Sequence, residues 1–170
     1  MAKPGSPSPN GWNVTIVLAV LTVFVLALSV PVSLSYARDH GGFYLFSRAF
    51  FEDIPKRLTG PGKFRFVLQP LIAIILGVRS GLADARASLP PYLYAVLFKR
   101  DLRREMMRNA FLTIVNLLLM GILIDSVCQW LILGISYPGA ALVVGPVLIV
   151  TPYTVSRALT NRFGRKHNSG

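Results

Sequence analysis

Three long apolar runs alternate with polar segments along this chain, at residues 13–35, 110–135 and 139–158. At about 1.5 Å per residue in a helix, each run is long enough to cross a hydrocarbon core of about 30 Å. The last two runs are separated only by the short sequence Ser136–Gly139, in which Pro138 cannot continue a helix. We therefore predict an all-α integral membrane protein with three transmembrane helices, of which the last two form a helical hairpin.

A fourth apolar segment, residues 64–86, is shorter and less uniform. Its charge-free core, from Phe66 to Val78, has 13 residues and contains Gln69 and Pro70. A run of this length favours a half-inserted or interfacial helix over a complete span. Four spans are the alternative, because the hydropathy of such a segment is a weak signal.

Polar and mixed segments complete the predicted organisation. Residues 1–11 are rich in Pro, Gly and Ser and predict a disordered tail, so that residues 12–170 form a single helical membrane domain. Residues 42–55 and 91–108 combine helical spacing of apolar residues with many charges, which predicts amphipathic helices at the membrane surface. For residues 42–55, a stripe that packs against the core between spans is an equal alternative. Pro31, inside the first apolar run, should kink or end that helix.

The composition agrees with a membrane protein and adds a strong basic bias. Hydrophobic residues make up 53% of the chain, charged residues only 15%, and the net charge is +11. The Lys and Arg residues lie at the ends of the apolar runs, which is typical of contacts with anionic phospholipids. This placement argues against nucleic acid as the partner.

The basic residues also predict the orientation, because cytoplasmic loops carry the excess of Lys and Arg. There are six in residues 38–65, seven in residues 79–108, and four in residues 157–166. If segment 64–86 does not cross, all three clusters lie on the cytoplasmic side. We then expect Lys63 and Arg103 on the same side, the N-terminus outside and the C-terminus in the cytoplasm.

Asp125 is the most conspicuous polar residue in an apolar run. A charged side chain near the middle of a membrane costs at least about 2.5–3.5 kcal/mol, so it must face protein or water. At about 100° per residue, Gln129 lies on the same helix face as Asp125, and Asn116 lies on the opposite face. We predict a structural polar contact, with Asp125→Asn tolerated and Asp125→Leu not. A proton or ion relay is the alternative. Arg79 is a candidate counter-charge, but extension of its side chain to the lipid headgroups is favoured.

Few residues suggest catalysis or a bound cofactor. Cys128 is alone, and His40 and His167 lie far apart, so we expect neither a metal site nor a haem site. No arrangement of nucleophile, base and acid is recognisable, and we expect no enzymatic activity. Residues expected to contact lipid headgroups or a protein partner are Arg79, Asp84, Arg86, Lys99, Arg100, Arg103 and Arg104.

The sequence "RFVLQPLIAIILGVRSGLADARASLPPYLYAVLF", residues 65–98, resembles a class of small multi-pass bacterial inner-membrane proteins that has no assigned activity. The likeness rests on "LQPLIA", "GVRSGLADAR" and "PPYL". It implies a location in the bacterial inner membrane and one shared structural element. The residues of that element would be Gln69, Pro70, Arg79, Asp84, Arg86, Pro90 and Pro91.

Three hypotheses for function follow. The first is a non-catalytic accessory or scaffold subunit that packs against other integral membrane subunits, or against itself, and against anionic phospholipids. The second is a transporter or channel component that uses Asp125. The third is an enzyme acting on lipid headgroups through residues 79–108. The small size and the tight hairpin favour the first.

Overall fold

The structure, a computed structural model, describes residues 9–60 and 62–168, and these form helices and connecting turns without a β-strand. The helices are α1 (Pro9–His40), α2 (Arg48–Thr59), α3 (Arg65–Arg86), α4 (Tyr92–Phe98), α5 (Arg100–Leu133) and α6 (Pro138–Asn168). Four of them, α1, α3, α5 and α6, are long and apolar enough to cross a membrane. The chain is thus an all-α protein with the features of a multi-pass membrane protein.

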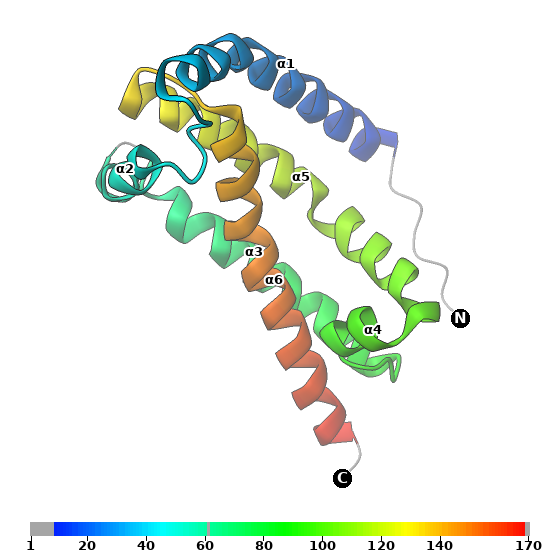
Figure 1. The fold of residues 1–170 in the computed structure, drawn as a ribbon. Helices are drawn as coiled ribbons and strands as arrows, with labels where there is room; N and C mark the ends of the chain where they lie inside the picture. The colour runs from blue at the N-terminus through cyan, green and yellow to red at the C-terminus, as the bar shows by residue number, and fades with distance from the viewer. Residues whose placement is uncertain (1–8, 61, 169–170) are drawn as a thin grey trace.

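The four long helices alternate in direction (Figure 1). Thr15 of α1 hydrogen-bonds to Asn116 of α5 at 2.7 Å, and Tyr36 packs on Tyr137 just after α5, so α1 and α5 run the same way. Helices α3 and α6 run the other way, with Gly81 packed against Arg157. One end of the bundle, called here the α2 end, holds α2 and the α5–α6 turn. The opposite end, the α4 end, holds α4, the starts of α1 and α5, and the ends of α3 and α6.

Segment 64–86, expected to be half-inserted or interfacial, contains the continuous helix α3, which is long and apolar enough to cross a membrane. Helix α3 lies alongside α6 over its whole length, so the predicted amphipathic segments 42–55 and 91–108 lie at opposite ends of the bundle. Three of the polar residues that lower the hydropathy of α3, Arg65, Gln69 and Asp84, are buried, and the two charged ones among them have partners inside the bundle. A hydropathy pattern counts such residues as unfavourable for insertion, because it cannot include those partners.

Several predicted boundaries also change. Helix α1 begins at Pro9, within the predicted tail 1–11, of which residues 1–8 lie outside the described residues. It continues through Pro31 to His40, since a membrane-spanning helix tolerates a proline better than a water-exposed one. Segment 91–108 is not one surface helix: it breaks at Lys99, and the residues after the break begin the long helix α5.

Glycines let the backbones of the central helices approach closely. A Cβ atom added to Gly77 would lie 2.6 Å from the carbonyl oxygen of Tyr153, and one added to Gly81 would lie 2.5 Å from that of Arg157. A Cβ atom on Gly145 of α6 would lie 3.1 Å from the backbone of Gly121 on α5. Small residues at four-residue spacing are a common basis of helix association in membranes. These glycines fix α6 between α3 and α5.

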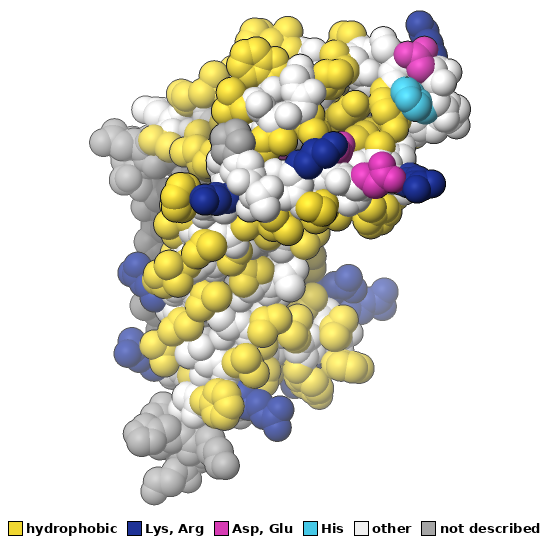
Figure 2. Space-filling view, turned by 90° about the vertical axis from the view of Figure 1, so that its left-hand side faces the viewer, with side chains coloured by type: hydrophobic (Ala, Val, Ile, Leu, Met, Phe, Trp, Pro, Cys, Tyr) yellow, Lys and Arg dark blue, Asp and Glu magenta, His cyan; other side chains and the backbone are white. Residues whose placement is uncertain are grey.

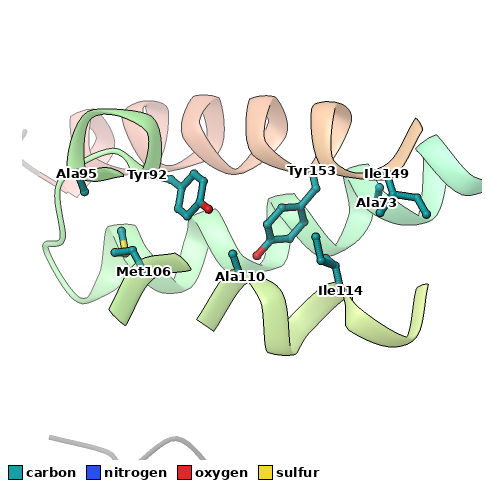
Figure 3. Close-up of a cluster of buried hydrophobic side chains, with 8 residues drawn as sticks. All are labelled: Ala73, Tyr92, Ala95, Met106, Ala110, Ile114, Ile149 and Tyr153. Atoms are coloured by element: carbon teal, nitrogen blue, oxygen red, sulfur yellow. The ribbon is translucent and has the colours of Figure 1, made fainter. Parts of the chain in front are cut away.

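The apolar core lies where α4 packs against these three helices (Figure 3). Tyr153 of α6 is fully buried at its centre, between α3 and α5. The remaining members of this cluster are Ala73, Tyr92, Ala95, Met106, Ala110, Ile114 and Ile149. Because α4 is only seven residues long, it closes the α4 end of the core without adding another span.

The outside of the bundle is largely apolar (Figure 2). On the face shown, hydrophobic side chains cover the middle, and most Lys and Arg side chains lie towards the margins. Large exposed apolar residues follow α1 from Val14 to Leu34. Such a surface is stable in lipid, where apolar exposure carries no penalty.

We expect Gly81→Ala to destabilise the bundle, because the new Cβ atom would collide with the backbone of α6. Overpacking of this kind costs about 1–3 kcal/mol. The matched control is Gly139→Ala on α6, where a Cβ atom would make an ordinary 3.7 Å contact with Leu45. Thermal unfolding in detergent should show a lower midpoint for Gly81→Ala alone. Equal midpoints for the two variants would contradict the close α3–α6 packing.

Candidate functional site

Two ionic clusters are buried inside the bundle, one towards each end. The first joins Asp84 of α3 to Arg157 of α6 near the α4 end. The second, called here the Asp125 cluster, consists of Asp125 and Gln129 of α5, Arg57 of α2 and Arg65 of α3. They differ in how completely their polar atoms are paired, and this difference identifies the candidate site.

The Asp84–Arg157 pair is complete. The guanidinium donates from Nε to one carboxylate oxygen at 2.7 Å and from Nη2 to the other at 3.0 Å. Its remaining nitrogen, Nη1, donates to the hydroxyl of Tyr153 at 3.1 Å, and the ring of Tyr92 lies 4.5 Å from the guanidinium carbon. One cation meets one anion in bidentate geometry. We interpret this pair as a structural clamp between α3 and α6.

The Asp125 cluster brings three elements to one carboxylate. Arg65, the first residue of α3, places Nη2 2.8 Å from Oδ1 of Asp125, and its Nη1 donates to the Asp125 carbonyl oxygen at 3.4 Å. Gln129 donates from Nε2 to Oδ2 at 2.6 Å. Arg57 of α2 lies further away, with Nη1 3.9 Å from Oδ2. Asp125 therefore holds α2 and α3 against α5.

A chain of polar contacts connects this cluster to the surface at the α2 end. Arg57 donates from Nη2 to the hydroxyl of Tyr44 at 3.1 Å, and that hydroxyl donates to Asp53 at 2.8 Å. Lys56, which is exposed, forms an ion pair with Asp53 at 2.8 Å. Burial, and next the hydrogen bond to Asp53, raises the pKa of Tyr44 far above its ordinary value. Burial opposes ionisation of Asp53, but the hydrogen bonds from Lys56 and Tyr44 outweigh it and lower the pKa of this carboxyl.

Two properties set the Asp125 cluster apart from the clamp. It holds two arginines for one carboxylate, and the arginines are only 2% and 4% exposed. Several of its buried atoms also have no hydrogen-bond partner: Nε and Nη1 of Arg57, Nε of Arg65, and both amide atoms of Gln69, one turn further along α3. Buried polar atoms are nearly always paired, so each of these orphans requires an explanation.

The structure places the predicted polar residues of α5 as follows. Asp125 and Gln129 are hydrogen-bonded to each other, whereas Asn116 accepts a hydrogen bond from Thr15 at the outside of the bundle. Asp125 does not lie at the middle of its helix, but eight residues before the end of α5 and level with the start of α3.

Arg79, the candidate counter-charge, does not contact Asp125. It is exposed, as the favoured surface role requires, and Arg57 and Arg65 take the position of the counter-charge. Both lie in the polar loop 38–65 of the sequence, where they were counted only as determinants of orientation. An arginine at the very start of an apolar helix, together with the only acidic residue of the apolar run 110–135, was the signal available in the sequence.

The predicted headgroup or partner contacts divide into two groups. Asp84 is buried in the clamp with Arg157 and has no surface role in this structure. The basic residues of that set are all exposed near the α4 end: Arg79, Arg86, Lys99, Arg100, Arg103 and Arg104. Among residues 13–60 and 62–164, whose side chains the structure describes, no three His, Cys, Asp or Glu residues group in a way that could hold a metal ion.

No protein-family model, curated protein or solved structure matches this chain. The functional argument therefore rests on the residues and their geometry.

The ion pair changes the expected effect of substitutions at Asp125. Asp125→Asn keeps the hydrogen bond with Gln129 but leaves two buried arginines without a counter-charge. Removing one partner of a buried pair costs about 3–5 kcal/mol, so we now expect Asp125→Asn to be strongly destabilising. Glu52→Gln, which breaks an exposed pair with Arg48, is the control and should have no measurable effect.

Thermal unfolding of both variants in detergent measures this difference. The double variant Asp125→Asn/Arg65→Gln should recover part of the lost stability, because it removes one of the two uncompensated charges. An Asp125→Asn variant as stable as the wild type would refute the role of Asp125 as the counter-charge.

Proposed function

We propose that all four long helices cross the bacterial inner membrane, with both termini on the cytoplasmic side. This orientation places the α4 end, with the basic residues of segments 79–108 and 157–166, in the cytoplasm, as the distribution of Lys and Arg favours. It replaces the expectation of an external N-terminus. The six basic residues of segment 38–65 then lie outside.

The contacts within that loop explain how so many basic residues can face outward. Arg57 and Arg65 are buried against Asp125. Lys56 and Arg48 form ion pairs with Asp53 and Glu52. Three carboxylates thus compensate half of the six positive charges of the loop, and the loop attracts the anionic cytoplasmic leaflet less than its composition suggests.

Labelling of single cysteines tests this topology. In intact cells, a membrane-impermeant thiol reagent should modify Lys63→Cys but not Arg103→Cys, and permeabilisation should expose both. The native Cys128 is buried and gives the background signal in the unsubstituted chain. Modification of both positions from the same side would establish the three-span alternative.

We further propose that the protein is a non-catalytic accessory or scaffold subunit that binds a transmembrane helix of another membrane protein. The observation that carries this proposal is a groove between α1 and α5. It has a volume of about 360 Å³ and is lined by Val25, Leu28, Ser29, Val32, Ser126, Val127, Trp130, Gly134, Ile135 and Ser136.

Helix α1 is loosely attached along this groove. Only 11% of its most apolar stretch is buried, compared with 22–33% for the other three long helices. Thr15 and Thr22 of α1 hydrogen-bond to α5, and Ser29 lines the groove. These three residues are seven positions apart, so they lie on one side of α1. Since α1 packs mainly on one neighbour, a helix from another protein has room to pack against both.

The chemistry of the groove favours a protein occupant over a lipid tail. The hydroxyls of Ser126 and Ser136 are buried beside the groove without a hydrogen-bond partner. Rotation of either side chain towards the groove would let a polar side chain of another helix satisfy it, which hydrocarbon cannot do, and such contacts contribute about 0.6–2 kcal/mol in membranes. A second copy of this chain is the homo-oligomeric form of the same proposal.

The α4 end supports the expected contact with anionic phospholipids. Helix α4 exposes Leu93, Tyr94, Leu97 and Phe98. Exposed basic residues follow directly: Lys99, Arg100, Arg103 and Arg104. Apolar and aromatic residues beside a basic cluster are suited to the boundary between acyl chains and headgroups, where each Lys or Arg contributes about 1 kcal/mol.

Site-specific photo-crosslinking in native membranes tests the subunit proposal. A photoreactive residue at Leu28, in the groove, should form one protein adduct, and its mass identifies either another membrane protein or a second copy of this chain. The same probe at Val23 is the control, because Val23 is exposed on α1 but does not line the groove. Leu28→Trp should fill the groove and remove the identified partner from the purified complex, whereas Val23→Trp should retain it. Lipid adducts alone at both positions would contradict the proposal.

A further inference from the structure

The Asp125 cluster carries one more positive charge than its side chains neutralise. Arg57 and Arg65 share a single carboxylate, and both guanidinium groups are almost fully buried. In a region of low dielectric constant an uncompensated charge costs several kcal/mol. The Asp84–Arg157 clamp of the same protein shows the balanced alternative.

No neighbouring group supplies the missing negative charge. Asp53 is the next carboxylate along the polar chain, but Lys56 already pairs with it. The hydroxyl of Tyr44, which accepts from Arg57, is neutral because its pKa is raised. The helix dipoles do not supply it either, because their effects at the two arginines offset each other. Arg57 lies in the last turn of α2, near a partial negative charge, whereas Arg65 begins α3, near a partial positive charge.

The unpartnered atoms around this charge are mainly hydrogen-bond donors. They are Nε and Nη1 of Arg57, Nε of Arg65 and Nε2 of Gln69, and all three side chains are at least nine-tenths buried. Gln69 lies one turn after Arg65 on α3, and its amide is near Gly121, one turn before Asp125. Donors on α2 and α3 therefore face the same part of α5.

We propose that the Asp125 cluster binds one small monovalent inorganic anion of the size of chloride, held by Arg57 and Arg65 with Gln69 as a further donor. Water could accept hydrogen bonds from these donors but would leave the positive charge uncompensated. A phospholipid headgroup or a carboxylate of a partner protein is too large to reach arginines that are 2% and 4% exposed. The anion would tie α2 to α3 and α5, because Arg57 is the residue through which α2 reaches the cluster.

The direct test measures the thermal unfolding of the purified wild-type protein in detergent. Sodium chloride is compared with sodium gluconate, whose anion is too large for the cluster, at equal ionic strength. One-site binding predicts a saturable rise of the unfolding midpoint with chloride, of about 3 °C or more well above the dissociation constant. Bromide should reproduce the rise.

Two matched variants assign the effect to the cluster. Arg57→Gln leaves Arg65 and Asp125 as a balanced pair, so its midpoint should no longer depend on chloride. Arg48→Gln removes an exposed arginine from the same helix and should keep the full dependence. The wild-type comparison itself needs no variant, so the test stands even if Arg57→Gln unfolds.

Three results would overturn the proposal. The first is an equal midpoint in chloride and gluconate for the wild type. The second is a chloride dependence that persists in Arg57→Gln, which would place the anion elsewhere. The third is a midpoint that rises with anionic phospholipid in the micelle and not with halide, which would assign the charge compensation to a lipid phosphate.

Discussion

Hydrocarbon offers no hydrogen bond to a polar side chain, and this constraint governs how the helices of this protein are arranged. Each charged residue that enters the bundle from an apolar helix meets a partner from another helix: Asp84 meets Arg157, and Asp125 meets Arg65. Because the partners lie on different helices, satisfying them fixes which helices are neighbours and in which direction they run. The apolar surface is compatible with many arrangements, but the two ionic clusters are compatible with few.

Close packing and charge pairing support each other along α3 and α6. Gly77 and Gly81 bring the two backbones together, and the Asp84–Arg157 pair follows directly after this contact. A bulkier residue at either glycine would separate the helices and lengthen the bidentate bond. The parallel orientation of α3 and α6 thus depends on residues that look unremarkable in a hydropathy profile.

The parts of the fold that depend on one helix alone could be predicted from the sequence. The apolar runs at 13–35 and 139–158 lie within long helices, and the run 110–135 extends two residues past the end of α5; the shared face of Asp125 and Gln129 follows from helical periodicity. The parts that depend on pairing between distant segments could not. Arg65 and Arg79 limit the charge-free part of segment 64–86 to 13 residues, and the sequence could not show that Arg65 and Asp84 pair with residues 60 and 73 positions away. Charge counting had the same weakness, since it treats a buried arginine as a surface one.

The sequence separation of these contacts has a consequence during synthesis. Thr15 meets Asn116 only after 101 further residues have been made, and Asp84 meets Arg157 only after 73. At about 5–20 residues per second, these waits last several seconds or longer. Helix α1 can wait alone in the bilayer, because it carries no charge between Val14 and Val30. For helix α3, waiting alone in the bilayer has a higher free-energy cost, since Asp84 remains without its arginine until α6 has been made. In the proposed four-span arrangement, the nascent chain therefore carries the Asp84 charge well before the residue that neutralises it, and stable insertion of α3 depends on α6.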